Sequence, residues 1–184
     1  GYTITASTLT LAAPSGSSSP VIAVSNNGFG TNRATISSTL AGSSGFTKTG
    51  DGTLVLTADN SAGFSGDIAI RGGALVITNA NQLGSGTTVI SVIGAAQIGN
   101  PGFSGGQLVL GGTITNAFDG ITLAREVSVS GRGPNSSNAA GGLLSVGYNT
   151  LSVGLTLSSG GSESRVTATH GITTVSGTVN LGAS

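Results

Sequence analysis

The chain of 184 residues contains no cysteine, methionine or tryptophan, and only 7% of its residues are charged. Without cysteine, disulfides cannot stabilise the fold. Six basic and six acidic residues cancel to a formal net charge of zero, so charge gives no indication of nucleic acid or an anionic membrane surface as a partner. No run of 18 apolar residues is present, so we expect no membrane span within this segment.

The absence of methionine, together with Gly1 as the first residue, predicts that this is a processed or excised segment of a longer protein. No signal peptide is visible. The lack of cysteine also suits a chain that crosses membranes unfolded, because no cross-link can form early.

Glycine, by contrast, is abundant with 33 residues, and 37% of the chain is hydrophobic. Disorder combines low hydrophobicity with high net charge, and neither holds here. Val, Ile, Leu and Thr recur in short runs separated by Gly, Asn, Ser and Pro, which is typical of β-strands. Helical periodicity is nearly absent. The composition therefore predicts an all-β fold.

One sequence pattern recurs within residues 45–93 at an interval of about 21 residues. The matched pairs are Gly52 with Gly73, Leu54 with Leu75, Val55 with Val76, Leu56 with Ile77, Thr57 with Thr78, Asn60 with Asn81, Gly63 with Gly84, and Ile68 with Val89. A third, weaker copy is expected to begin at Gly94, with Ala95 and Ile98 in the places of Ala74 and Ile77.

Such a period predicts a parallel β-solenoid, in which each copy is one coil and stacked coils share one core. We expect a single solenoid over 1–184 with more divergent coils at both ends, roughly nine coils of about 20 residues. At about 4.8 Å per coil the rod would be on the order of 40 Å long. Its inner stacks are predicted to contain Leu54, Leu56, Ile68, Leu75 and Ile77. A β-sandwich also has short strands, but it does not require nearly identical sequence segments at a fixed interval.

In that arrangement Gly and Asn are expected at the corners between strands, where a positive φ is needed. Lys48 and Asp51 are predicted to decorate a corner.

The stretch GFTKTGDGTLVLTADNSAGFSGDIAIRGGALVITNANQLGSG, at 45–86, resembles the passenger-associated transport repeat of bacterial autotransporter proteins. The pattern positions are Phe46, Lys48, Gly50, Gly52, Leu54, Leu56, Asn60, Phe64, Gly66, Ile68, Ile70, Gly73 and Leu75. Residues 121–157 are similar to sequences that flank such repeats in large bacterial surface proteins. The resemblance implies a right-handed parallel β-helix at the outer surface of a Gram-negative bacterium or in the medium.

Candidates for chemistry are few. His170 is the single histidine, and no partner that could orient it lies nearby in sequence. Ser104 in GFSGG formally matches a nucleophile elbow, but a strand-like run follows it where a helix is required, which indicates a turn residue. Asp51, Asp59 and Asp67 could bind Ca²⁺ or hydrolyse glycosides, yet their eight-residue spacing places them on different corners or faces.

The remaining polar motifs do not indicate a binding or catalytic site either. Arg125 adjoins Glu126, and Arg132 lies in an expected loop, but neither arginine forms a basic patch. Asn135 heads a formal glycosylation sequon, which carries little weight in a bacterial protein. The seven Phe and Tyr residues are too few for an extended binding face and are expected mainly in the core. We therefore predict no catalytic, cofactor or metal site and no enzymatic activity.

The sequence thus indicates a non-catalytic, surface-displayed or secreted segment that acts as a rigid stalk or scaffold with an adhesive role. Its expected partners are other copies or neighbouring coils of the same protein, and host surfaces, matrix surfaces or glycans. Two alternatives are a self-assembling subunit of an extracellular filament, sheath or matrix, and a β-helix enzyme acting on polysaccharides. No cofactor and no nucleic acid are expected.

Overall fold

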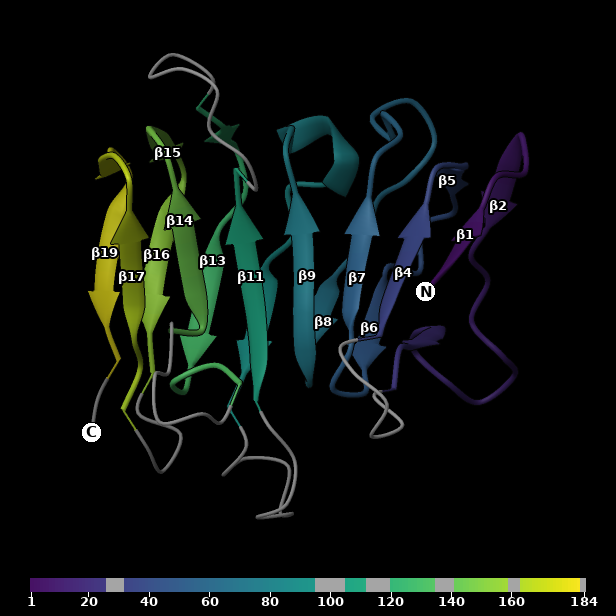
Figure 1. Ribbon diagram of the computed structural model, residues 1–184, viewed down its shortest axis with the longest axis horizontal. Coiled ribbons are helices and arrows are strands. Elements are labelled where there is room, and N and C mark those ends of the chain that lie inside the picture. The colour runs from purple at the N-terminus through teal and green to yellow at the C-terminus, as the bar shows by residue number, and fades with distance from the viewer. Residues whose placement is uncertain (26–31, 95–104, 112–119, 135–140, 159–162, 183–184) are drawn as a thin grey trace.

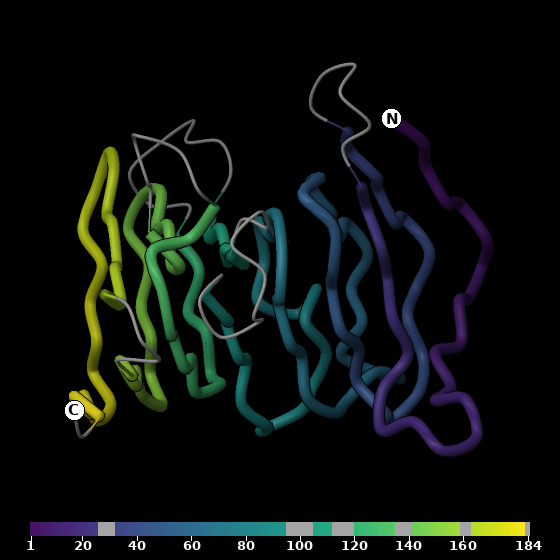
Figure 2. The backbone as a smooth tube through the Cα atoms, turned by 90° about the horizontal axis from the view of Figure 1, so that it is seen from below, coloured from purple at the N-terminus to yellow at the C-terminus, as the bar shows by residue number. Residues whose placement is uncertain are grey.

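The computed structural model describes residues 1–25, 32–94, 105–111, 120–134, 141–158 and 163–182, and every structural statement below refers to them. The chain winds into stacked coils, and its two termini lie at opposite ends of the stack (Figure 1). Viewed at a right angle, the successive coils lie side by side along one axis (Figure 2). All strand pairings in the described residues are parallel. The predicted all-β parallel solenoid is confirmed.

Two seven-stranded sheets form the long faces of the solenoid. The first sheet consists of β1 (Tyr2–Ile4), β4 (Arg33–Ile36), β7 (Thr53–Leu56), β9 (Gly73–Ile77), β11 (Gly106–Leu110), β14 (Leu143–Val146) and β17 (Val166–Thr169). The second sheet consists of β3 (Val21–Ala23), β6 (Phe46–Thr49), β8 (Ile68–Ile70), β10 (Ile90–Ile93), β13 (Val127–Ser130), β16 (Gly154–Leu157) and β19 (Thr178–Leu181).

A third side is shorter and interrupted. Its strands are β2 (Thr8–Thr10) and β5 (Thr39–Ala41) at one end, and β12 (Thr122–Leu123), β15 (Asn149–Leu151) and β18 (Thr173–Val175) at the other. Between them lie the isolated bridge of Gly42 with Phe64 and the 3-10 helix η1 (Ala80–Leu83). Each coil therefore has two regular sides and one variable side.

The described strands define seven coils, whereas the sequence predicted roughly nine. The register of the first sheet gives the reason. Leu54 pairs with Leu75 at an interval of 21 residues, but Leu75 pairs with Leu108 at an interval of 33, and Leu108 pairs with Leu143 at an interval of 35. Several coils are thus longer than the repeat period, because chain is inserted between strands whose stacking is unchanged.

The same insertion displaces the expected third copy. Gly106, not Gly94, stands in register with Gly73, and Leu110 stands in register with Ile77. The prediction that this copy begins at Gly94 was wrong. Ala95 and Ile98, which were matched to Ala74 and Ile77, lie outside the described residues.

Stacked apolar side chains fill the interior between the two sheets. In the first sheet the stack at one position contains Leu54, Leu75, Leu108 and Leu143, all fully buried. In the second sheet the corresponding stack contains Phe46, Ile68, Ile90, Val127 and Leu155. Full burial of such a side chain contributes roughly 1.5–3 kcal/mol. The five predicted inner residues Leu54, Leu56, Ile68, Leu75 and Ile77 are all at most 1% exposed, so that prediction is confirmed.

Glycines occupy tight corners of the repeat, as expected. Gly50 and Gly73 have φ of 74° and 60°, values that L-residues with a side chain rarely adopt. A Cβ on Gly73 would also collide with the carbonyl oxygen of Gly52 in the preceding coil. The recurrent glycine of the repeat is therefore required both by backbone conformation and by the close approach of successive coils.

Candidate functional site

The corner after β6 contains a buried cation. The Lys48 side chain is fully buried, and its Nζ donates hydrogen bonds to the carbonyl oxygens of Thr49 at 2.9 Å, Gly50 at 2.8 Å and Gly72 at 2.9 Å. Gly72 belongs to the following coil, so the ammonium joins two coils. The prediction that Lys48 decorates a corner was wrong about its exposure. The alternation of β6 could have revealed this, because Lys48 shares the inward face with Phe46.

Burial has an electrostatic consequence at this corner. Removal of the ammonium from water lowers the pKa of Lys48 from 10.5 to about 8, and the negative charge of Asp51 partly opposes that shift. The Asp51 side chain itself is exposed, as predicted for a corner.

A buried amide joins three coils at the next corner. The Asn60 Oδ1 accepts a hydrogen bond from the Leu40 backbone N–H at 2.7 Å, and its Nδ2 donates to the Gln82 carbonyl oxygen at 2.6 Å. Asn60 is only 1% exposed, so both bonds are shielded from water. Asn149 repeats part of this arrangement further along, where its Oδ1 accepts from the Ile121 N–H at 2.8 Å.

A second buried cation, Arg125, lies in a later coil and donates hydrogen bonds to backbone carbonyls of earlier coils. The Arg125 guanidinium donates to the carbonyl oxygens of Gly66 at 2.8 Å, Leu83 at 2.8 Å and Thr88 at 2.9 Å. Burial lowers its pKa below the ordinary value, and Asp67 opposes this shift. Its neighbour Glu126 instead accepts a hydrogen bond from the Thr156 hydroxyl at 2.8 Å. Arg125 is only 3% exposed, and the sequence analysis did not predict this burial.

Two of the aromatic residues lie in the core, as expected. The rings of Phe46 and Phe64 are at most 1% exposed, and their centroids are 5.8 Å apart. Tyr2 and Tyr148 differ from the expectation, since they are 55% and 46% exposed. The remaining aromatic positions, Phe29, Phe103 and Phe118, lie outside the described residues.

The chemistry candidates that the structure describes lie on the surface of the solenoid. His170 is exposed, with a φ of 56°. Asp51, Asp59 and Asp67 are all exposed, and the described residues contain no group of three or more His, Cys, Asp or Glu side chains that could hold a metal ion. Ser104 and Asn135 lie outside the described residues.

Asp59 has a local structural role on the surface. Its carboxylate accepts hydrogen bonds from the Ser61 hydroxyl, from the Ser61 N–H at 2.9 Å and from the Asn81 side chain at 2.9 Å. These bonds lower the pKa of Asp59, and the Ser61 hydroxyl makes the largest contribution. Since Asn81 belongs to the next coil, Asp59 also connects neighbouring coils.

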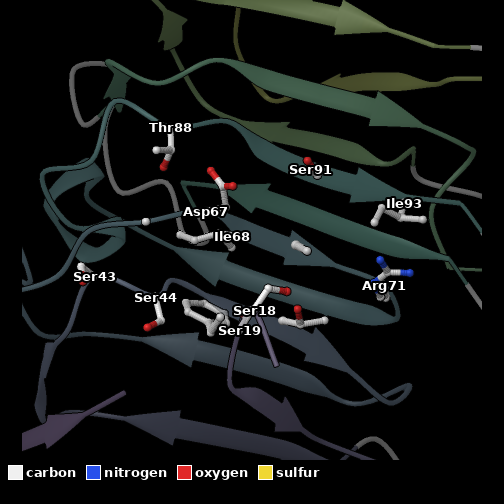
Figure 3. A pocket seen from close by; sticks show the side chains of 14 residues that line it. Ser18, Ser19, Ser43, Ser44, Asp67, Ile68, Arg71, Thr88, Ser91 and Ile93 are labelled. Atoms are coloured by element: carbon white, nitrogen blue, oxygen red, sulfur yellow. The ribbon is translucent and has the colours of Figure 1, made fainter. Parts of the chain in front are cut away.

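A hollow of about 520 Å³ lies on the outer face of the second sheet (Figure 3). Serine and threonine hydroxyls dominate its lining, and Asp67 and Arg71 provide its charged groups. The outer residues Thr47, Ala69 and Ser91 belong to β6, β8 and β10, which pair in register. This hollow is the candidate binding surface of the segment.

No helix among the described residues is long and apolar enough to cross a membrane.

Comparison with known proteins decides the family of the repeat. The family model described as Passenger-associated-transport-repeat matches residues 46–77. The resemblance of residues 46–77 to this repeat is thereby confirmed. These residues include Lys48, Asn60 and Phe64, so the buried contacts of these three side chains belong to the repeat itself.

The chain is also similar to the protein "Adhesin BmaC autotransporter" of Brucella suis biovar 1 (strain 1330). The two are 37% identical over 120 residues, which is 61% of this chain but 3% of the length of the adhesin. No solved structure matches the chain. The resemblance to autotransporter passenger domains is confirmed, and it places the segment at the cell surface or in the secreted fraction.

Proposed function

We propose that this passenger segment is a non-catalytic, rigid scaffold that displays an adhesive surface. The observation that carries the proposal is the stacking of seven coils through in-register apolar side chains, reinforced by buried polar side chains that cross between coils. The similarity to an adhesin supports the adhesive part.

Rigidity follows from the number of independent connections between coils. Each interface has two parallel strand pairings, a shared apolar core and, within the repeat, a buried lysine or asparagine that donates to a neighbouring coil. Bending the rod at such an interface would break several of these contacts together. Because each coil contacts mainly its neighbours, folding can proceed by addition of one coil to the last, without disulfides.

Adhesion can be tested with beads that present the chain densely. We expect coated beads to adhere to epithelial cells or to a matrix-coated surface more strongly than beads coated with an inert protein, because many weak contacts act together. Equal retention of the two bead types would contradict the adhesive role. Turnover of any member of a polysaccharide panel would contradict the non-catalytic role.

We also propose that residues 1–184 fold as one solenoid unit. The strand pairings run without a break through both long sheets, from β1 and β3 to β17 and β19. Limited proteolysis should therefore cut within connecting loops while the cut chain remains associated. Early separation into two stable folded halves would argue for two domains.

A second candidate function, self-assembly into a filament or matrix, is favoured by the end coils. Val21 in β3 is 62% exposed, and Val179 and Leu181 in β19 are 53% and 73% exposed. Unpaired strand edges with apolar side chains can pair with another copy, unless further coils of a longer chain cover them. Analytical ultracentrifugation at increasing concentration tests this candidate, and a strict monomer would contradict it.

A further inference from the structure

The hollow on the second sheet crosses four coils along the solenoid axis. Its floor contains the outward side chains of Thr47, Ala69 and Ser91, one from each of three adjacent strands. Its wall includes Ser18 and Ser19, which precede β3. Adjacent strands are about 4.8 Å apart, so the floor offers similar positions at regular intervals. The volume of about 520 Å³ is within the range of ligand pockets.

Several polar groups of the hollow are available to a ligand. The hydroxyls of Ser43, Ser44 and Ser91 make no hydrogen bond to another described residue. Asp67 and Arg71 are exposed, and within the described part of the chain neither takes part in an ion pair. Asp67 lies beside Thr88 at one end of the hollow, and Arg71 lies beside Ile93 at the other (Figure 3).

We propose that this hollow binds an uncharged glycan, an inference that rests on the proposed adhesive function. Serine and threonine hydroxyls both donate and accept hydrogen bonds, as sugar hydroxyls do. The Asp67 carboxylate can accept from two neighbouring sugar hydroxyls, and the Arg71 guanidinium can donate to sugar oxygens. One charge of each sign disfavours a polyanion as well as a polycation.

The backbone argues against a peptide that adds as a strand. Strand addition needs an open sheet edge, but β8 is already paired with both β6 and β10 beneath the hollow. Any ligand must therefore be held by side chains, and the side chains present are mostly hydroxylic.

A single hollow is expected to bind a glycan with low affinity. Phe46 lines the hollow but is fully buried, so it offers no exposed aromatic face for a sugar ring. Hydrogen bonds with groups that are otherwise hydrated give little net affinity. We expect Kd of about 1 mM for one site, with useful adhesion arising from many copies on one surface.

Heteronuclear NMR titration of the whole chain tests the proposal. The probes are three uncharged hexasaccharides (cellohexaose, maltohexaose and chitohexaose), a heparin hexasaccharide, and a flexible peptide rich in serine and threonine. We expect at least one uncharged hexasaccharide to shift the amide signals of Thr47, Ala69 and Ser91 in a saturable way. The proposal is overturned if none does so, or if the heparin fragment or the peptide binds there more tightly.

Two matched variants locate the site. Ala69→Gln fills the floor and should weaken binding at least tenfold. Ser128→Gln adds the same side chain to the same outer column beyond the hollow, since Ser128 is in register with Ser91, and should leave Kd within twofold of the wild type. Equal binding by the two variants would also overturn the proposal. Asp67→Asn, which keeps the shape but removes the charge, should weaken binding severalfold.

The bead assay separates this inference from the proposed function. If Ala69→Gln beads adhere as well as wild-type beads, the adhesive function stands but the hollow is not its site. If the wild-type chain binds a glycan in the hollow but its beads do not adhere, the site stands and the adhesive function fails.

Discussion

Replacement of Lys48 by methionine tests the role of the buried ammonium. The substitution keeps a long side chain in the core but removes the donor to the Gly50 and Gly72 carbonyl oxygens. The Thr49 carbonyl also loses this donor, but it still accepts from the Val24 N–H at 3.0 Å. A buried carbonyl left without a partner costs about 1–3 kcal/mol, partly offset because no charge is buried in the variant. We expect a net destabilisation of about 2–4 kcal/mol near neutral pH.

The pH dependence gives a second, independent readout. Because the pKa of Lys48 falls from 10.5 to about 8 on folding, the unfolded chain binds this proton more tightly than the folded protein. The cost of burying the charge is therefore fully present below about pH 8 and is relieved between pH 8 and pH 10.5. The wild type should gain up to about 3 kcal/mol over that window relative to Lys48→Met, at 1.36 kcal/mol for each pKa unit.

Urea unfolding followed by circular dichroism measures both effects. Arg71→Met is the matched control, because Arg71 is an exposed cation in the same repeat. It should change stability by less than about 0.5 kcal/mol, and its difference from the wild type should not vary over this window, since arginine stays charged. The reasoning is refuted if Lys48→Met is as stable as the control near neutral pH. It is also refuted if the advantage of the wild type over Lys48→Met shrinks as pH rises.

Three further substitutions test other contacts between coils. Asn60→Ala removes the acceptor for the Leu40 N–H and the donor to the Gln82 carbonyl. It should lower the free energy of unfolding by about 2–4 kcal/mol in the same urea assay. A smaller loss of stability than that of Arg71→Met would contradict a buried role for Asn60 in joining coils. Gly73→Ala places a Cβ against the Gly52 carbonyl at a positive φ and should cost at least about 2 kcal/mol, seen as a lower thermal midpoint. Arg125→Met should unfold at lower urea than Arg165→Met, because Arg165 is in an exposed ion pair with Glu163.

Much of the fold could be predicted because the repeat is visible in the amino-acid sequence. The recurrence of the pattern in Thr53–Leu56 and Gly73–Ile77 specifies which residues stack, and the two-residue period of a strand places Leu54 and Leu56 on the same inward face. The coil count could not be predicted in the same way. An insertion between Ile93 and Gly106 lengthens one interval between paired strands without any change in their pairing. A count based on the average period treats those extra residues as additional coils.

The candidate functional site was harder to predict from the sequence than the fold. Lys48 and Arg125 look like surface residues by type, since charged side chains are seldom fully buried. Their burial depends on carbonyl oxygens contributed by other coils, at Gly72 for Lys48 and at Gly66 and Leu83 for Arg125. The hollow has no sequence signature, because its lining comes from four coils and consists mainly of residues that are common throughout the chain.

By itself, the sequence determined the parallel solenoid, the inward position of the leucine and isoleucine stacks, and the resemblance to autotransporter passenger domains, because a repeated local pattern carries all three. Only the tertiary structure decided how many coils stack, which cations are buried and where a ligand could bind. These properties depend on which backbone atoms meet when one coil settles on the next, and that juxtaposition is set by loop lengths that the repeat does not encode.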